Sequence, residues 1–296
     1  MAERTTVDVI TSRANRWIKM FRAGLRGSGP SGDEPIAVEG PKLIEDALHH
    51  GIEAQAMLVS ESGEREMERI LRAASESESG IARSRVLRTT DKIFEGLSGT
   101  ESPQGVAALF RQPAWTFEDI VGPAGIEQQG DDSRAESPLL LVMAGVQDPG
   151  NVGTMLRSGE AFGASGVIAT RGTADPWSPK AVRASAGSAL RLPVLRGMSV
   201  PVVLAQLRVS KIKIVATGSG SSKDGGSTGR TQINLREPVA IFIGNEGAGL
   251  GSEAETAADA HISIPMSETV ESLNAGIAAS ILLYEVARQR RLDSTR

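Results

Sequence analysis

The fold of the second half of this chain is decided by residues 139–157, which read Leu-Leu-Leu-Val-Met-Ala-Gly-Val-Gln-Asp-Pro-Gly-Asn-Val-Gly-Thr-Met-Leu-Arg. The apolar run Leu139–Ala144 predicts a strand that is buried on both faces, as in a parallel sheet. A helix from 152 to 162 is predicted to follow, with Asn151 near its N-terminus, where the side chain can cap free amides. Open α/β sheets bind ligands at the carboxyl ends of their strands, so Arg157 on this helix is a candidate functional residue.

The rest of the second half repeats this order of strand and helix. Strands are expected at residues 166–170, 192–195, 211–217, 239–243 and 261–264, and helices at 179–190, 200–209, 252–258 and 275–291. The alternation predicts an α/β fold with a mostly parallel sheet that is covered by helices on both faces. Ser252 and Glu255 have the spacing of a capping box at the start of one helix. The Gly/Ser-rich residues 218–230 are predicted to form a flexible insert.

The first half predicts a separate, smaller α/β unit. Helices are expected at residues 11–25, 42–50, 64–75 and 91–97, and strands at 36–38, 55–59, 85–87 and 105–110. The segment 113–137 contains prolines, glycines and a polar run without periodic apolar positions, so we interpret it as a linker. The predicted domains are therefore 1–112 and 138–296.

The composition of the 296 residues narrows the class of protein. Hydrophobic residues make up 40% of the chain, enough for a sizeable core, and no apolar run reaches membrane-spanning length. Cysteine is absent and the histidines are His49, His50 and His261, so disulfides, a structural zinc site and a histidine-based triad are not expected. We expect no metal, no membrane and a cytoplasmic location, since the first residues also lack the pattern of a signal peptide.

The formal net charge of −4 argues at first against a nucleic-acid partner, but the charges are unevenly distributed. Residues 1–26 hold six Lys or Arg and two acids, residues 157–196 again six and two, and residues 118–136 hold six acids and one Arg. The basic residues of the first predicted helix recur every three or four positions along one stripe, which consists of Arg13, Arg16, Lys19, Arg22 and Arg26. This basic stripe is a candidate for binding RNA phosphates. The alternatives are that it is only a solvated face, and that RNA docks around Arg183 and Arg191.

A glycine-rich motif follows the strand predicted at 239–243. It reads Gly244-Asn-Glu-Gly-Ala-Gly-Leu250, and its glycines allow a sharp turn and a close approach to a ligand. Alone, the motif is equally compatible with an ordinary turn between a strand and a helix. A dinucleotide-binding loop is disfavoured because it needs the first strand of a βαβ unit and an acidic residue about 20 positions later. A P-loop is disfavoured because no Gly-Lys-Ser/Thr follows.

A third motif leads into the last predicted helix. It consists of Ile264-Pro-Met and, further on, Glu271-Ser-Leu-Asn274. Ser272 and Asn274 are ordinary capping residues. Their separation of two also lets both side chains point into one loop cavity, so the motif is compatible with capping and with function.

In this combination and order, the three motifs resemble those of the SpoU/TrmH family of RNA ribose 2′-O-methyltransferases, part of the SPOUT superfamily. The resemblance covers about residues 139–291, with Asn-x-Gly-x-x-x-Arg, Gly-Asn-Glu-Gly-x-Gly, and Ile-Pro-Met with Ser-Leu-Asn. It implies a trefoil knot in the second domain, which nothing in the composition or periodicity reveals. The first domain is similar to the family's L30e-like substrate-binding domain, through Glu39-Gly and Ser102-Pro-Gln-Gly-Val106.

The resemblance implies that S-adenosylmethionine is the cofactor and that backbone groups of the knot loops bind it. The positions that the motifs carry over are Thr217, Gly218, Ile243, Gly244, Ile264, Leu273 and Asn274. The catalytic candidates are Arg157, Asn151, Glu246, Ser272 and Asn274. A guanidinium stays protonated in almost any protein environment, so we expect Arg157 to hold a phosphate and stabilise charge on O2′ rather than act as the base. Glu246 and Asn151 are expected to hold Arg157, and Asn274 or Ser272 to orient the ribose.

The expected activity is therefore methylation of a ribose 2′-hydroxyl, in ribosomal RNA first and in tRNA as the alternative. Two other classes are a non-catalytic RNA-binding protein of the same fold and a nucleotide-binding oxidoreductase. The intact Arg157, Glu246 and Asn274 argue against the first, and the placement of the glycine motif argues against the second. Members of the family are homodimers packed through the knot region, so we expect a homodimer with active sites near its interface.

Overall fold

The chain forms two compact units in the computed structural model, which describes residues 8–76, 84–122, 137–218, 233–267, 269–270 and 272–291. The first unit comprises Met1–Pro113 with Trp177–Arg191, and the second comprises Ala114–Pro176 with Leu192–Arg296. Most of the predicted linker and all but the first residue of the predicted insert lie outside the described residues. Within those ranges, no helix is both long and apolar enough to cross a membrane.

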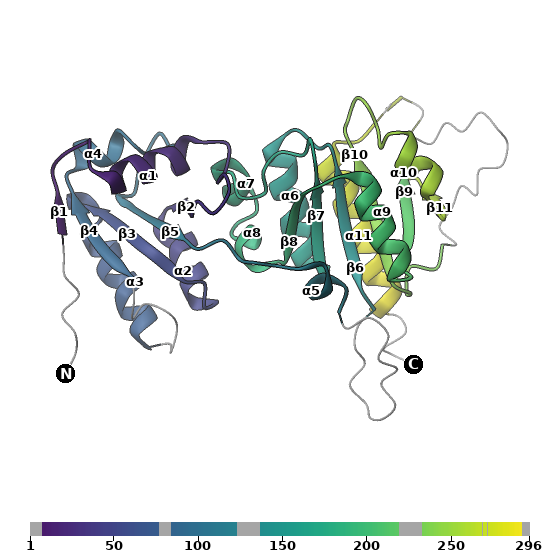
Figure 1. Ribbon diagram of the computed structural model, residues 1–296, viewed down its shortest axis with the longest axis horizontal. Helices are drawn as coiled ribbons and strands as arrows, with labels where there is room; N and C mark the ends of the chain where they lie inside the picture. The colour runs from purple at the N-terminus through teal and green to yellow at the C-terminus, as the bar shows by residue number, and fades with distance from the viewer. Residues whose placement is uncertain are drawn as a thin grey trace. The chain divides into compact units, whose positions relative to one another are not determined.

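The second unit is built on a six-stranded sheet in which every neighbouring pair is parallel. Its strands are β6 (Leu139–Ala144), β7 (Gly166–Thr170), β8 (Val194–Met198), β9 (Lys213–Thr217), β10 (Val239–Gly244) and β11 (Ala260–Ile262). They lie in the order β11-β9-β10-β6-β7-β8 across the sheet (Figure 1). The predicted parallel α/β sheet is thus confirmed.

Helices cover both faces of this sheet (Figure 1). On one face lie α5 (Phe117–Val121), α9 (Val200–Val209) and α10 (Ser252–Ala257), and on the other α6 (Pro149–Ala161) packs beside α11 (Ala275–Arg291). The core under α9 contains strand residues such as Val142 and Phe242 together with Leu207 of the helix, and all three are fully buried. Strand residues that are buried on both faces explain the continuous apolar run from which this sheet was predicted.

Helix α6 begins at Pro149, three residues earlier than predicted. Its N-cap is Asp148, whose Oδ1 accepts a hydrogen bond of 2.9 Å from the amide of Asn151. Of the two interpretations of Asn151, capping of this helix is thus excluded, because Asp148 occupies the cap and proline suits the first helical position. The side chain of Asn151 is left for a different contact.

Three other local predictions are corrected. The N-cap of α10 is Gly251 and no side chain caps it, so Ser252 and Glu255 do not form a capping box. The helix predicted at 179–190 is interrupted at Ala186 and Gly187, whose φ angles are 49° and 90°, and gives α7 (Pro179–Ala184) and α8 (Ser188–Arg191). The predicted linker begins with a helix, α5, which a capping box between Thr116 and Asp119 stabilises.

Arg290, near the end of α11, holds together the two segments that lead into the central strands β6 and β10. Its Nη2 donates hydrogen bonds of 3.1 Å to the carbonyl oxygens of Pro138 and Glu237. Its Nε donates to the carbonyl oxygen of Leu235 at 3.2 Å, and its Nη1 donates to that of Ser137. One guanidinium therefore satisfies backbone acceptors at the start of both strands.

The first unit contains a five-stranded mixed sheet with the strand order β1-β4-β3-β5-β2. The strands are β1 (Asp8–Ile10), β2 (Ile36–Glu39), β3 (Ala54–Ser60), β4 (Arg85–Thr89) and β5 (Val106–Phe110), and β5 runs antiparallel to both of its neighbours. One face is covered by α1 (Arg16–Arg26) and α4 (Asp91–Glu95), and the other by α2 (Pro41–His49) and α3 (Glu64–Glu76). A short 3₁₀ turn, η1 (Glu61–Gly63), precedes α3.

Helix α1 presents an apolar face to its sheet and a basic face to solvent. Ile18, Phe21 and Leu25 are buried against the sheet. The helix begins at Arg16 rather than at Thr11, because Asn15 caps it by accepting a hydrogen bond of 2.8 Å from the amide of residue 17. The residues just before it form β1, which was not predicted.

Candidate active site

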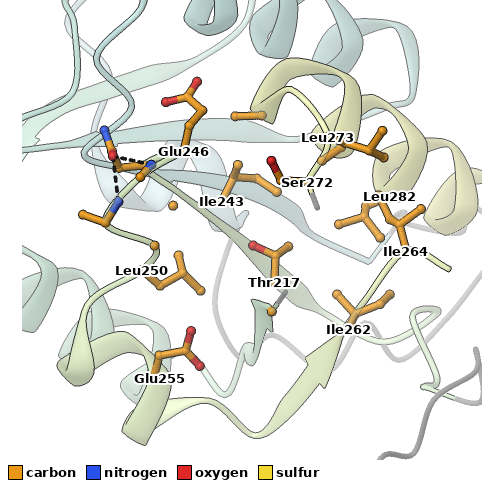
Figure 2. Close-up of a pocket in the computed structure, with 18 of the residues that line it drawn as sticks. Thr217, Ile243, Glu246, Leu250, Glu255, Ile262, Ile264, Ser272, Leu273 and Leu282 are labelled. Atoms are coloured by element: carbon orange, nitrogen blue, oxygen red, sulfur yellow. Dashed lines mark hydrogen bonds between the residues drawn. The ribbon is translucent and has the colours of Figure 1, made fainter. Parts of the chain in front are cut away.

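A cavity of about 420 Å³ lies in the second unit at the carboxyl ends of β9 and β10. This volume is in the range of small-molecule sites, ~300–1,000 Å³. Much of its wall is apolar, with Ile243, Ile264 and Leu273 among the labelled side chains that surround it in Figure 2. An apolar hollow at this edge of a parallel sheet is where α/β enzymes bind ligands.

The cavity brings together most of the site residues predicted from the motifs. Those that line it are Thr217, Gly218, Ile243, Gly244, Glu246, Ile264, Ser272 and Leu273. The sequence reasoning missed further lining residues, which include Leu250, Glu255, Ile262, Met266, Ala278 and Leu282. A signal existed for two of these, since Ala278 and Leu282 share the apolar face of the predicted last helix.

The glycine-rich loop is fixed by Asn245. Its Oδ1 accepts hydrogen bonds from the amides of Gly247 at 2.9 Å and Ala248 at 3.0 Å, and its Nδ2 donates to the carbonyl oxygen of Gly145 at 3.1 Å. The backbone of Asn245 also exchanges two hydrogen bonds with Gly249. The loop is therefore closed on itself and tied to the end of β6.

Gly244 has to be a glycine for a different reason. A Cβ at this position would lie 2.4 Å from the carbonyl carbon of Gly249 and 2.7 Å from the amide nitrogen of Leu250. Both atoms belong to the backbone and cannot rotate away. The turn after β10 is therefore compatible only with a residue that has no side chain.

The end of β9 is tied to its neighbours on both sides. The hydroxyl of Thr217 donates to the carbonyl oxygen of Phe242 at 2.8 Å, and the amide of Gly218 donates to that of Ile262 at 3.1 Å. Both donors are thus used within the sheet. At these two positions the described residues offer a ligand carbonyl oxygens and apolar surface rather than donors.

One residue from each motif joins a hydrogen-bonded chain at the rim of the cavity. Asn274 caps α11 by accepting from the amides of Gly276 and Ile277 at 3.0 and 3.2 Å. Its Nδ2 donates to Oδ1 of Asn151 at 2.8 Å, and Nδ2 of Asn151 donates to Oε1 of Glu246. The cap of α11 thus orients Asn151, and Asn151 orients the Glu246 carboxylate. Asn274 and Asn151 do not themselves line the cavity.

Arg157 does not join this chain. It is exposed on α6, and among the residues that the structure describes it has no hydrogen-bond or ion-pair partner. At 100° per residue, six residues along a helix place Arg157 about 120° around the axis from Asn151, so the two side chains do not share a face. Among the described residues, neither Glu246 nor Asn151 forms the expected hydrogen bond or ion pair with Arg157. Asn151 donates a hydrogen bond to Glu246 instead.

The basic stripe lies in the first unit, on the solvent side of α1 and, at Arg13, in the turn before it. Arg13, Arg16 and Lys19 are exposed, whereas Arg22 is half-buried. The guanidinium of Arg16 lies 5.1 Å from the ring centroid of the neighbouring Trp17, and Nε of Arg26 donates to the carbonyl oxygen of Ser98 at 3.0 Å. Arg26 is exposed as well. Four of the five side chains thus have the exposure that a phosphate-binding surface requires.

A parallel α/β unit with an apolar cavity at its strand ends is the arrangement in which α/β proteins, many of them enzymes, bind a small-molecule ligand. Comparison with known proteins narrows this class. The model of the SpoU rRNA methylase family matches residues 138–284, and that of the MRM3-like substrate binding domain matches residues 33–108. The chain belongs to the SpoU family, and the resemblance in the motifs is thereby confirmed.

Individual relatives cover nearly the whole chain. An uncharacterized tRNA/rRNA methyltransferase of Mycobacterium tuberculosis is 30% identical, over 92% of this chain and 80% of its own. The 23S rRNA (guanosine(2553)-2′-O)-methyltransferase RlmP of Bacillus subtilis is 29% identical, over 84% and 87%. The crystal structure of an AdoMet-bound rRNA methyltransferase from Sinorhizobium meliloti is similar with a TM-score of 0.74 and 28% identity, over 95% of this chain and 98% of that one.

Proposed function

We propose that this protein transfers the methyl group of S-adenosylmethionine to a ribose 2′-hydroxyl of ribosomal RNA. The observation that carries the proposal is the hydrogen-bonded chain of Asn274, Asn151 and Glu246, which joins the three motifs at the rim of an apolar cavity. The three residues belong to the motifs by which the chain resembles the SpoU family, which supports a role for them near the reacting groups. Transfer RNA remains the alternative substrate.

The cavity suits S-adenosylmethionine. The wall formed by Ile264, Leu273 and Leu282 offers apolar surface to a purine, and the turn at Gly244 lets the backbone come close to a ligand. When bound, the cofactor supplies an electrophilic methyl group on its sulfonium sulfur. Relatives whose structures contain AdoMet support this assignment.

The chain's own residues then have to position the ribose and stabilise the charge that develops on O2′. We assign the positioning to Asn274, Asn151 and Ser272, with Glu246 held in place by Asn151. Arg157 is unpaired among the described residues, and we assign to its guanidinium the role of holding an RNA phosphate and stabilising the developing charge. Its exposure leaves it accessible to RNA.

We further propose that the two domains have different roles. Residues 1–112 bind RNA through the basic stripe, residues 138–296 carry out the chemistry, and residues 113–137 join them. Because the Bacillus relative is named for a guanosine of 23S rRNA, a guanosine is the first nucleoside to test. The trefoil knot and the cytoplasmic location stay predictions.

A homodimer is the assembly that we propose. The outer side of α11 exposes Ile277, Ile281 and Tyr284, with exposed fractions of 51%, 40% and 54%. Tyr284 also packs edge-on against Phe162 at the end of α6, with 5.8 Å between ring centroids. A row of large apolar side chains on a helix next to the active site suits the interface between two subunits.

Methyl transfer from labelled S-adenosylmethionine to ribosomal and transfer RNA tests the proposal directly. We expect incorporation into a 2′-O-methyl group of ribosomal RNA by the wild-type protein. The variant Arg157→Ala should lose ~100- to 1,000-fold in rate, the usual cost of one charge-stabilising donor, and keep its cofactor affinity. Arg236→Ala, which removes an exposed arginine at the opposite ends of the strands, is the control and should retain the rate. Binding of NAD without binding of S-adenosylmethionine would contradict the proposal.

A further inference from the structure

The cavity contains a second carboxylate that the proposed chemistry does not use. Glu246 and Glu255 are the acidic residues among the described residues that line it. Figure 2 shows them at opposite ends, with Glu246 near Ser272 and Glu255 below Thr217 and Leu250. Glu246 already accepts a hydrogen bond from Asn151, so the two carboxylates have different surroundings.

Glu255 is held in position by the local structure of α10. Leu250 and Ala254 on either side of the helix start are buried in the core, which fixes the helix against the sheet. Oε2 of Glu255 lies 3.0 Å from Nε2 of His261 on the edge strand β11, and the side chain is 42% exposed. Its other oxygen, Oε1, has no partner among the described residues and is available to a ligand.

The labelled side chains in Figure 2 give the cavity three chemically distinct corners. The polar corner holds Glu246 and Ser272, the apolar corner holds Ile264, Leu273 and Leu282, and the third corner holds Glu255. S-adenosylmethionine has three arms at its sulfur, which are the methyl group, the adenosyl group and the aminobutyrate chain. The first two arms match the polar and the apolar corner.

On this basis we propose that Glu255 binds the α-ammonium group of S-adenosylmethionine. The third arm carries this cation, and an ammonium group has three donors for a carboxylate acceptor. The inference rests on the proposed function, because the positions of the adenosyl and methyl groups follow from that function. Glu255 is then a cofactor-binding residue outside the three motifs, and this role explains the acidic side chain in α10.

Binding of two unreactive ligands tests this assignment without methyl transfer. S-adenosylhomocysteine carries the amino-acid arm, and 5′-methylthioadenosine has the same nucleoside thioether without it. In calorimetry with Glu255→Gln, we expect the affinity for S-adenosylhomocysteine to fall about 5- to 10-fold, as for a charge-assisted hydrogen bond that partial exposure weakens. The affinity for 5′-methylthioadenosine should stay within about 2-fold, which also shows that the cavity of the variant is folded.

Glu253→Gln is the matched control, since Glu253 is an exposed acid of the same helix that does not line the cavity. It should leave both affinities unchanged. An equal loss for both ligands in Glu255→Gln would assign the carboxylate to the ribose hydroxyls and overturn the inference, as would no loss for either. Failure of the wild-type protein to bind S-adenosylhomocysteine would instead reject the proposed function itself.

Discussion

A single residue, Gly244, decides the shape of the cavity wall after β10. A methyl group there would lie 2.4 Å from a backbone carbon of Gly249, so the variant Gly244→Ala can fold only if the loop moves. Overpacking of this kind costs ~1–3 kcal/mol, and the displacement falls on the cavity wall. We expect the affinity for S-adenosylhomocysteine, measured by calorimetry, to fall about 10- to 100-fold.

Gly247 offers a control in the same loop. A Cβ at this position would meet only Oδ1 of Asn245, at an ordinary distance of 3.6 Å. Gly247→Ala should therefore keep an affinity within about 3-fold of the wild type. If both alanine variants lost the same affinity, general flexibility of the loop would matter rather than the close approach at Gly244.

The sequence predicted which types of residue surround the site, but not the structural role of each one. The motif indicated glycines near a ligand, yet the need at Gly244 arises from Gly249, which the fold brings against it. Asn151 and Asp148 are both good N-caps, and residue preference cannot choose between two candidates three positions apart. Glu255 and His261 gave no signal because their pairing depends on how α10 lies beside β11.

The basic stripe along helix α1 is the surface that we propose for RNA binding. Neutralising Arg13, Arg16 and Arg22 together should raise the apparent KM for RNA. It should also reduce the slope of log binding constant against log salt by about 2–3, since each phosphate contact contributes ~0.7–0.9. The measurement is RNA binding over a series of salt concentrations, with cofactor affinity as the quantity that should not change.

The control is a triple variant of Arg65, Arg69 and Arg88, which removes the same charge from other parts of the first unit. Arg69 is paired with Glu45 and Arg88 with Glu64, so these two cations are already partly compensated. An unchanged slope in the α1 variant would leave the stripe as solvated surface. RNA would then have to dock elsewhere, for example around Arg183.

Element boundaries were predicted best where apolar periodicity is long. The last helix was expected at 275–291, and α11 has these bounds. The prediction of one helix at 179–190 was wrong because Ala186 adopts a left-handed φ of 49°. An alanine rarely has such an angle, so the sequence did not indicate the interruption. The helix α5 was missed because it has only five residues and a single capping box.

The proposed homodimer can be tested at the exposed apolar side of α11. Replacing Ile281 by Arg puts a charge into the exposed apolar row of α11, so it should convert a dimer into monomers at micromolar concentration in light scattering. Val209→Arg on α9, where the side chain is 84% exposed, is the control and should leave the assembly unchanged. A wild-type protein that is monomeric and fully active would contradict the proposal.

The pairing of β6 with β10 has a consequence for how the chain is made. Leu139 lies opposite Val239 and Ala144 opposite Gly244, so a ribosome must add about 100 residues before β6 can gain this neighbour. The guanidinium of Arg290 that holds both strand starts is synthesised later still. Such distant contacts fold slowly, and the half-made sheet exposes an apolar edge. Nascent chains that stop before α11 should therefore depend on chaperones and be readily degraded.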